Sequence, residues 1–261
     1  MKIITAFKVC PDFDKLKKSD LTVEEEMSVD THFLPNVLNC YDESALELAL
    51  RLKEKNAEAE LSAITVGGKR EEPTLNTLLA LGYCHAVKAP VDEKLFRFHP
   101  DRTARALAAY NEACPQDLIL LGQEAPLGNS SAVPALASLY TGYPLITSVI
   151  DIPDIREEAV TLRAVRANEV IEIRAALPCV AVIGNAVISK LRVPTLRDRM
   201  KSREKKIETF QAEDEIAGSS LTPVKLETVS RLRAGRVSAQ KGCEAIMDVY
   251  RESLKERLGA L

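Results

Sequence analysis

Short apolar runs of strand length alternate with longer amphipathic runs over the first 150 residues of the chain. The strand-like runs, each bounded by Gly, Pro or polar residues, are Lys2–Val9, Glu60–Val66, Cys84–Val87, Asp117–Leu121 and Leu145–Ile150. The helix-like runs between them are 45–56, Pro73–Gly82, Asp101–Cys114 and Ser130–Tyr140. Because this alternation is typical of parallel strands joined by crossover helices, the sequence predicts an α/β fold with helices on both faces of a parallel sheet.

The pattern changes after Asp151. Two β-rich runs, Ala159–Ala164 and Glu169–Ile173, flank a turn near Ala167–Asn168 and predict a β-hairpin insertion, which the strand Val180–Ile183 follows. A basic stretch begins at Lys190, a loop-like stretch follows, and the run Ala239–Leu258 has the pattern of an amphipathic helix. These changes predict three parts: a nucleotide-binding α/β domain at 1–189, a separate segment at 190–206, and an extended C-terminal arm with its helix at 207–261.

The stretch Asp117–Leu139 combines a strand, a loop of small residues and a helix. This geometry presents backbone N–H groups to a phosphate, and Asn129, Ser130 or Ser131 can cap the helix. A plain β–α turn with an ordinary cap explains the same pattern equally well. Because ligands of parallel sheets bind beyond the carboxyl ends of the strands, we expect three loops to face one crevice. They are Ala6–Asp12, Val66–Gly68 and Gly122–Ser131.

Composition excludes several classes of function. The formal charge of −3 and the absence of Trp argue against nucleic-acid binding, and no apolar run is long enough for membrane insertion. The six cysteines are dispersed and only three His are present, so we expect no metal site. Glycine-rich dinucleotide and P-loop motifs are missing, as are a nucleophile elbow and an ATP-pyrophosphatase loop. The sequence therefore predicts a cytoplasmic protein that binds a nucleotide without cleaving it and has no catalytic residue.

Five sequence blocks, in order, resemble those of the electron transfer flavoprotein β subunits, and they cover nearly the whole chain. They are Ala6–Asp12 (AFKVCPD), Asn39–Glu47 (NCYDESALE), Leu79–Gly82 (LALG), Asp117–Gly122 (DLILLG), and a later block formed by Leu177–Ile183 with Val193–Ile207. The resemblance implies a flavodoxin-like, adenine-nucleotide-binding fold in three layers. It also implies a heterodimer with an α subunit that carries the electron-transferring FAD, while this chain holds AMP or a second FAD.

By position in these blocks, the resemblance implies a set of cofactor-binding residues. They are Ala6, Lys8, Asn39, Cys40, Asp42, Val66, Gly122, Gln123, Ala125, Gly128, Asn129, Ser130 and Ser131. The chain departs from the family pattern in this region: Gln123 replaces a basic residue, and Glu124 replaces a glutamine. A carboxylate there opposes a phosphate unless it points away or binds a ribose hydroxyl. Ser130 replaces a threonine and keeps its hydroxyl.

The resemblance further implies a docking segment for an acyl-CoA-type or other flavin dehydrogenase, which would supply the electrons. Leu196 matches the docking leucine, and Arg197 and Lys201 lie beside it. An apolar anchor within a basic rim suits a brief encounter between proteins. The alternative for Leu196 is a buried core leucine ahead of a surface helix. The alternative for the whole chain is a nucleotide-binding sensor of the same architecture without a redox role.

Overall fold

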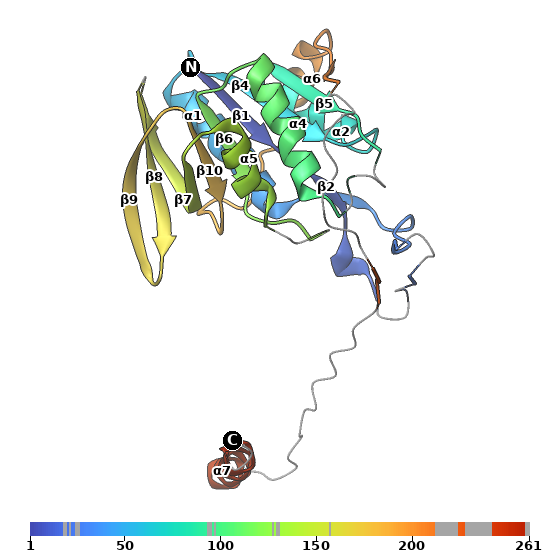
Figure 1. Ribbon diagram of the computed structural model, residues 1–261, viewed down its shortest axis with the longest axis vertical. Helices are drawn as coiled ribbons and strands as arrows, with labels where there is room; N and C mark the ends of the chain where they lie inside the picture. The colour runs from blue at the N-terminus through green and yellow to red at the C-terminus, as the bar shows by residue number, and fades with distance from the viewer. Residues whose placement is uncertain are drawn as a thin grey trace. The chain divides into compact units, whose positions relative to one another are not determined.

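The computed structural model describes residues 1–17, 20, 22–23, 27–92, 96, 98–126, 128, 131–156, 158–211, 224–227 and 242–258. The chain forms two compact units, Met1–Leu226 and Glu227–Leu261. The first unit contains a large sheet with its covering helices (Figure 1). The described part of the second unit contains the helix α7 (Cys243–Leu258).

The sheet has nine strands in the order β11-β5-β4-β1-β6-β10-β7-β8-β9. Every pair from β11 to β7 is parallel, whereas β7, β8 and β9 pair antiparallel. The strands are β1 (Lys2–Ala6), β4 (Glu60–Val66), β5 (His85–Ala89), β6 (Leu118–Gly122), β7 (Leu145–Ile155), β8 (Ala159–Arg166), β9 (Glu169–Ala176), β10 (Cys179–Ile183) and β11 (Glu208–Thr209).

Helices cover the parallel part of the sheet on both faces. The helices α1 (Cys40–Lys55) and α2 (Glu72–Leu81) pack on one face, and α4 (Pro100–Ala113) and α5 (Val133–Thr141) on the other (Figure 1). Successive residues of a strand point to opposite faces, so Ile3 joins the core under α1 and α2 and Ile4 joins the core under α4 and α5. The predicted three-layer α/β fold is confirmed.

The N-terminal strand is shorter than predicted. Instead of one strand over Lys2–Val9, the chain leaves the sheet after Ala6 and continues as β2 (Val9–Pro11), which pairs antiparallel with β3 (Asn36–Leu38). Pro11 is the last residue of this strand, where its missing N–H is tolerated. A short 3-10 helix, η1 (Phe13–Lys15), lies between β2 and β3. The residues Phe7 and Lys8 between β1 and β2 therefore form a turn at the carboxyl edge of the main sheet.

The helices α1, α4 and α5 begin without a side-chain cap. The N-cap of α1 is Asn39, and the N-cap of α5 is Ala132, one residue after the predicted cap Ser131. For α5, and likewise for α4 whose N-cap is His99, a proline in the first turn fixes the start instead. The hydroxyl of Ser131 donates to the Glu124 carboxylate and does not cap α5.

The predicted hairpin is confirmed as β8 and β9, which extend the sheet beyond β7 and leave β9 at its outer edge. The turn lies at Ala167, whose φ of 52° is in the left-handed region. β7 runs to Ile155, farther than the predicted Ile150, because its second half pairs with β8. The hairpin and β7 together form the antiparallel end of the sheet.

The basic stretch contains one short helix, α6 (Leu196–Lys201), which a capping box between Thr195 and Asp198 begins. β11 follows it and adds to the sheet edge beside β5. The division into 1–189, 190–206 and 207–261 stays a prediction, and most of the predicted arm lies outside the described residues. Within the described part of the chain, no helix combines the length and the apolar character that a bilayer crossing needs.

Candidate functional site

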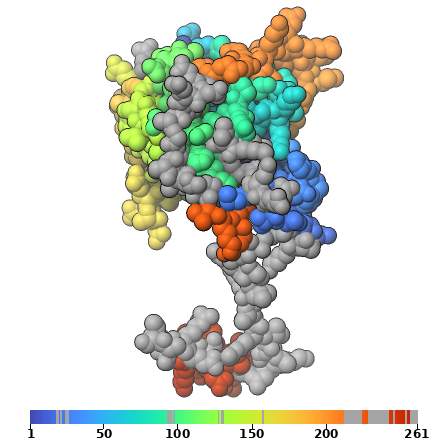
Figure 2. All heavy atoms as spheres, turned by 45° about the vertical axis from the view of Figure 1, so that its right-hand side comes forward, coloured from blue at the N-terminus to red at the C-terminus, as the bar shows by residue number. Residues whose placement is uncertain are grey.

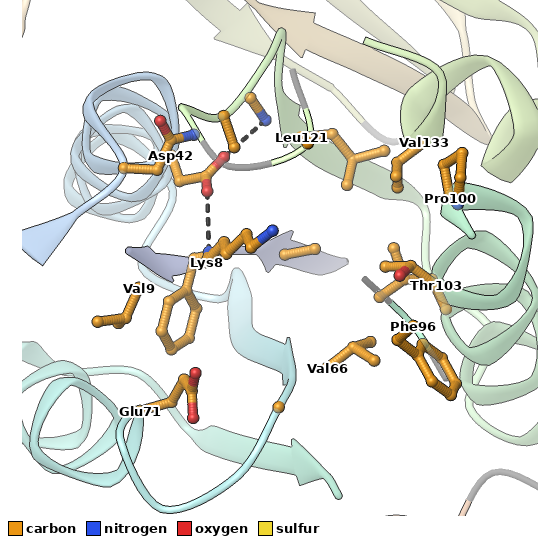
Figure 3. Close-up of a pocket in the computed structure, with 18 of the residues that line it drawn as sticks. Lys8, Val9, Asp42, Val66, Glu71, Phe96, Pro100, Thr103, Leu121 and Val133 are labelled. Atoms are coloured by element: carbon orange, nitrogen blue, oxygen red, sulfur yellow. Dashed lines mark hydrogen bonds between the residues drawn. The ribbon is translucent and has the colours of Figure 1, made fainter. Parts of the chain in front are cut away.

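A pocket of about 570 Å³ opens at the carboxyl edge of the parallel sheet, beyond β4, β1 and β6. The loops that follow these three strands all line it, which confirms the prediction that they face one crevice. The first turns of α4 and α5 close the side across from them. Figure 3 shows this arrangement, with Lys8 extending into the pocket from the turn between β1 and β2. The volume is within the range of sites that bind small molecules and cofactors.

The polar wall of the pocket is built around the carboxylate of Asp42, in the first turn of α1 (Figure 3). One oxygen accepts a hydrogen bond from the backbone N–H of Lys8 at 2.9 Å, and the other accepts one from the N–H of Gly122 at 3.0 Å. Asp42 thus ties the turn after β1 to the end of β6. Gly122 is required at this point, because a Cβ there would lie 2.1 Å from the Asp42 oxygen.

Burial raises the pKa of Asp42 to about 7, because the ionised carboxylate loses its hydration. The hydrogen bonds from the backbone and from Asn39, together with the charge of Lys8, act in the opposite direction and do not cancel this effect. The carboxyl group therefore changes its charge near neutral pH, at the centre of the pocket wall.

Asp42 is expected to make the protein less stable as the pH rises from about 4 to about 7. Its folded pKa is above the value of 3.8 for an exposed aspartate, so the folded protein binds the proton more tightly than the unfolded chain in this window. A shift of this size corresponds to roughly 4 kcal/mol. Urea unfolding of the wild type and of Asp42→Asn, which cannot ionise, should show this loss in the wild type alone. An equal pH slope in both proteins would contradict the assignment.

Asn39 lies beside this wall as the N-cap of α1. Its amide donates to the backbone carbonyl of Glu124 at 2.9 Å, while its Oδ1 is buried without a hydrogen-bond partner among the described residues. The Glu124 carboxylate receives the hydroxyls of Tyr41 and Ser131, each at 3.4 Å. These two hydrogen bonds engage the carboxylate of Glu124 within the protein, and they therefore weaken the repulsion that this carboxylate would exert on a phosphate in the pocket.

The opposite side of the pocket is apolar and lies against the start of α4. Val66, Phe96, Leu121 and Val133 line it, with Pro100 and Thr103 from the first turn of α4 (Figure 3). Such a side suits the flat face of a heterocyclic ring, whereas the wall near Asp42 suits its polar substituents. Sequence reasoning missed Phe96 and Phe98, because the sequence between β5 and α4 that holds them carries no motif.

Charged residues from the loop after β4 complete the lining. Lys69 and Arg70 are exposed, whereas Glu71, the N-cap of α2, is only 8% exposed. The sequence placed the Gly67–Gly68 turn at the crevice but not the three residues after it. These residues closely follow a central strand in the sequence, and that position could have predicted that they line the crevice.

Most of the residues that the family resemblance assigns to cofactor binding do line the pocket. These are Ala6, Lys8, Asn39, Asp42, Val66, Gly122, Gln123, Ala125, Gly128 and Ser131. Cys40 is exposed and does not line it. Asn129 and Ser130 lie outside the described residues. The pocket has features that fit a nucleotide: the N-terminus of the nine-residue helix α5 for a phosphate, and buried acceptors for its hydroxyl and amino groups.

The residues assigned to docking, Leu196, Arg197 and Lys201, lie on α6 and not in the pocket. Leu196 is 76% exposed, so the alternative of a buried core leucine is wrong. Val193 and Met200 are also exposed. In Figure 2 this segment, in orange, projects from the surface of the first unit.

Arg192 anchors to α1 the start of the segment 190–206, which carries α6. Its guanidinium binds Glu47, with Nη2 at 2.6 Å from Oε1, and also Glu54; its backbone N–H donates to Glu47 at 3.1 Å. Although burial acts to raise the pKa of Glu47, the hydrogen bonds and charge of Arg192 hold it below its usual range. At the other end, Lys205 donates to the backbone carbonyl of Tyr83 at 2.9 Å. Both ends of the segment between Arg192 and Lys205 are therefore held by hydrogen bonds to other parts of the first unit.

Comparison with known proteins agrees with this geometry. A sequence model of the electron transfer flavoprotein domain matches residues 26–215. The electron transfer flavoprotein subunit beta of Bacillus subtilis (strain 168) is 31% identical over 234 residues, which are 87% of this chain and 89% of that protein. The YgcR protein of Escherichia coli (strain K12), whose name assigns it provisionally to the electron transfer flavoprotein subunits, is 29% identical over 213 residues, 79% of this chain and 80% of that protein. The chain thus belongs to the electron transfer flavoprotein family, as a divergent member of the β-subunit type.

Proposed function

We propose that this chain is the β subunit of a heterodimeric electron transfer flavoprotein, an electron carrier rather than an enzyme. Its α partner would hold the redox-active FAD, and the pocket described above would hold AMP, or a second FAD in its place. The complex would pass electrons from a flavin dehydrogenase to an acceptor. The observation that carries the proposal is the pocket at the ends of β4, β1 and β6, in a chain of this family.

The chemistry of the pocket supports a nucleotide with a single phosphate end. The N-terminus of α5 offers backbone N–H groups on one side, and Lys8 adds a cation to the lining. The apolar side at Val66 and Phe96 suits a base, and the unsatisfied Oδ1 of Asn39 suits a hydroxyl donor. A second FAD would place its adenosine half on the same groups.

The test is to produce the chain together with its α partner, denature the purified complex, and quantify the released nucleotides. One AMP beside one FAD per complex supports the AMP form of the proposal. Two FAD support the form with a second flavin. One FAD and no other nucleotide would overturn the assignment of the pocket.

Leu196→Ala is expected to raise the KM of the complex for its reducing dehydrogenase about tenfold, with its flavin content unchanged. The reason is the loss of an exposed apolar anchor within a basic rim. The matched control is Leu139→Ala, because Leu139 is 70% exposed and lies on α5 rather than on α6. Equal effects of the two substitutions, or flavin loss in Leu196→Ala, would contradict a docking role.

A further inference from the structure

Glu71 is a carboxylate that nothing in the described structure explains. Only 8% of its surface is exposed, and its Oε2 has no hydrogen-bond partner among the described residues. It is the N-cap of α2, yet its side chain does not cap that helix. A buried polar atom without a partner is rare in folded proteins and points to a group that the protein chain alone does not supply.

The position of Glu71 indicates what kind of group would bind its carboxylate. The side chain lines the pocket and lies against Gly67, where an added Cβ would be 2.8 Å from its carboxyl carbon. Gly67 directly follows Val66, a member of the apolar side. An acceptor thus lies on the loop that follows Val66, one member of the apolar side. Figure 3 shows Glu71 on the side of Val9, across the pocket from Pro100 and Val133, the members of that apolar side at the starts of α4 and α5.

The loop that carries Glu71 follows β4, the segment that leads to α5 follows β6, and β1 lies between these two strands. Neighbouring strands are about 4.8 Å apart, so the ends of β4 and β6 are roughly 10 Å apart. That distance suits a mononucleotide laid across the three strand ends, with its phosphate at α5 and the far edge of its base at Glu71.

From these observations we propose that Glu71 reads the base of the nucleotide, by accepting a hydrogen bond from an exocyclic amino group. The inference rests on the proposed function of the pocket and adds its base specificity. A 6-aminopurine presents an N–H donor to the carboxylate. A 6-oxopurine presents a carbonyl oxygen, and two acceptors would then face each other without a proton between them. The same preference holds whether the adenosine belongs to AMP or to FAD.

The experiment compares AMP with IMP, which differ at this position of the ring. The complex with its α partner is unfolded and refolded with FAD and equal concentrations of AMP and IMP, and the retained nucleotides are quantified after a second denaturation. The wild type should retain AMP over IMP by tenfold or more, because a site built to pair with a donor rejects the analogue that lacks it. In Glu71→Gln the ratio should fall to within about threefold of one, since a side-chain amide both donates and accepts.

The matched control is Glu72→Gln, which makes the same change of charge one residue along. Glu72 pairs with Lys88 and does not line the pocket, so the preference for AMP should persist. Gly67→Ala is a second variant that leaves Glu71 in the sequence but forces its carboxylate to move. It should also lower the ratio of AMP to IMP, and it keeps the proposal testable if Glu71→Gln fails to fold.

The results that would contradict the role of Glu71 differ from those that would contradict the proposed nucleotide site. Retention of AMP and IMP in equal amounts by the wild type would overturn the role of Glu71, while the pocket would still bind a nucleotide. An unchanged preference in both Glu71→Gln and Gly67→Ala would overturn it as well. Retention of neither nucleotide, with only the FAD of the α subunit bound, would instead count against the nucleotide site itself.

Discussion

A Gly122→Ala variant is expected to lose about 3 kcal/mol of folding stability and to bind the nucleotide proposed for the pocket more weakly. The new Cβ would lie 2.1 Å from Oδ1 of Asp42 and 2.9 Å from Cβ of Tyr41, so the carboxylate must leave its place. Overpacking of this kind costs about 1–3 kcal/mol. The backbone N–H groups of Lys8 and Gly122 then lose the acceptor they share. Both bonds are only partly buried, so each loss costs about 0.5–1.5 kcal/mol. Together with the overpacking the total is about 2–6 kcal/mol.

Gly68→Ala is the matched control, because Gly68 lines the same pocket but has no atom within 4 Å of the position a Cβ would take. Its stability in urea should stay within about 0.5 kcal/mol of the wild type. Comparable stability of the Gly122→Ala and Gly68→Ala variants would contradict the view that the Asp42 bridge holds the pocket together.

Arg192→Ala is expected to destabilise the protein by about 2–3 kcal/mol and to weaken docking. Glu47 is only 4% exposed, and removal of the Arg192 guanidinium leaves its buried carboxylate with Arg51 at 3.4 Å and the backbone N–H of residue 192 at 3.1 Å. Since Arg192 lowers the pKa of Glu47, the stability that it contributes is present above the usual pKa of glutamate and is lost in acid. The difference from the wild type in urea unfolding should therefore shrink as the pH falls below about 4.5.

Arg51→Ala is the control for this prediction, because it removes the half-exposed partner of the same carboxylate. It should cost less than about 1 kcal/mol, as surface ion pairs do. Equal losses in the two variants, or a difference that does not change with pH, would show that the backbone contacts of the segment hold it without the guanidinium.

The sequence predicts the position of the pocket because local patterns determine it. Each strand-like run ends in a short loop, and parallel strands bring these ends to one edge. The ends of β1, β4 and β6 could thus be placed together before any contact was known. The face that each helix buries follows in the same way from its apolar stripe, as α1 shows with Leu46, Leu48 and Leu52 in the core.

The contacts that shape the pocket could not be predicted in this way. Asp42 looks like a cap for its own helix, but its partners are 34 and 80 residues away in the chain. Glu47 looks like an exposed acid on an amphipathic helix, yet its partner Arg192 is 145 residues away. For Leu196, helical periodicity left a core position as an alternative to an exposed one, and only the fold decides between them.

The Asp42 bridge also has a thermodynamic consequence. Because it joins three segments that are distant in the sequence, the pocket exists only when the sheet is complete. A ligand of the pocket therefore binds the native state alone and raises its population by mass action. At a free concentration one hundred times its Kd, such a ligand adds about 2.7 kcal/mol to the stability. If the pocket binds the nucleotide proposed for it, the melting temperature of the protein should rise with the concentration of that free nucleotide, and the folded fraction would then report the supply of nucleotide.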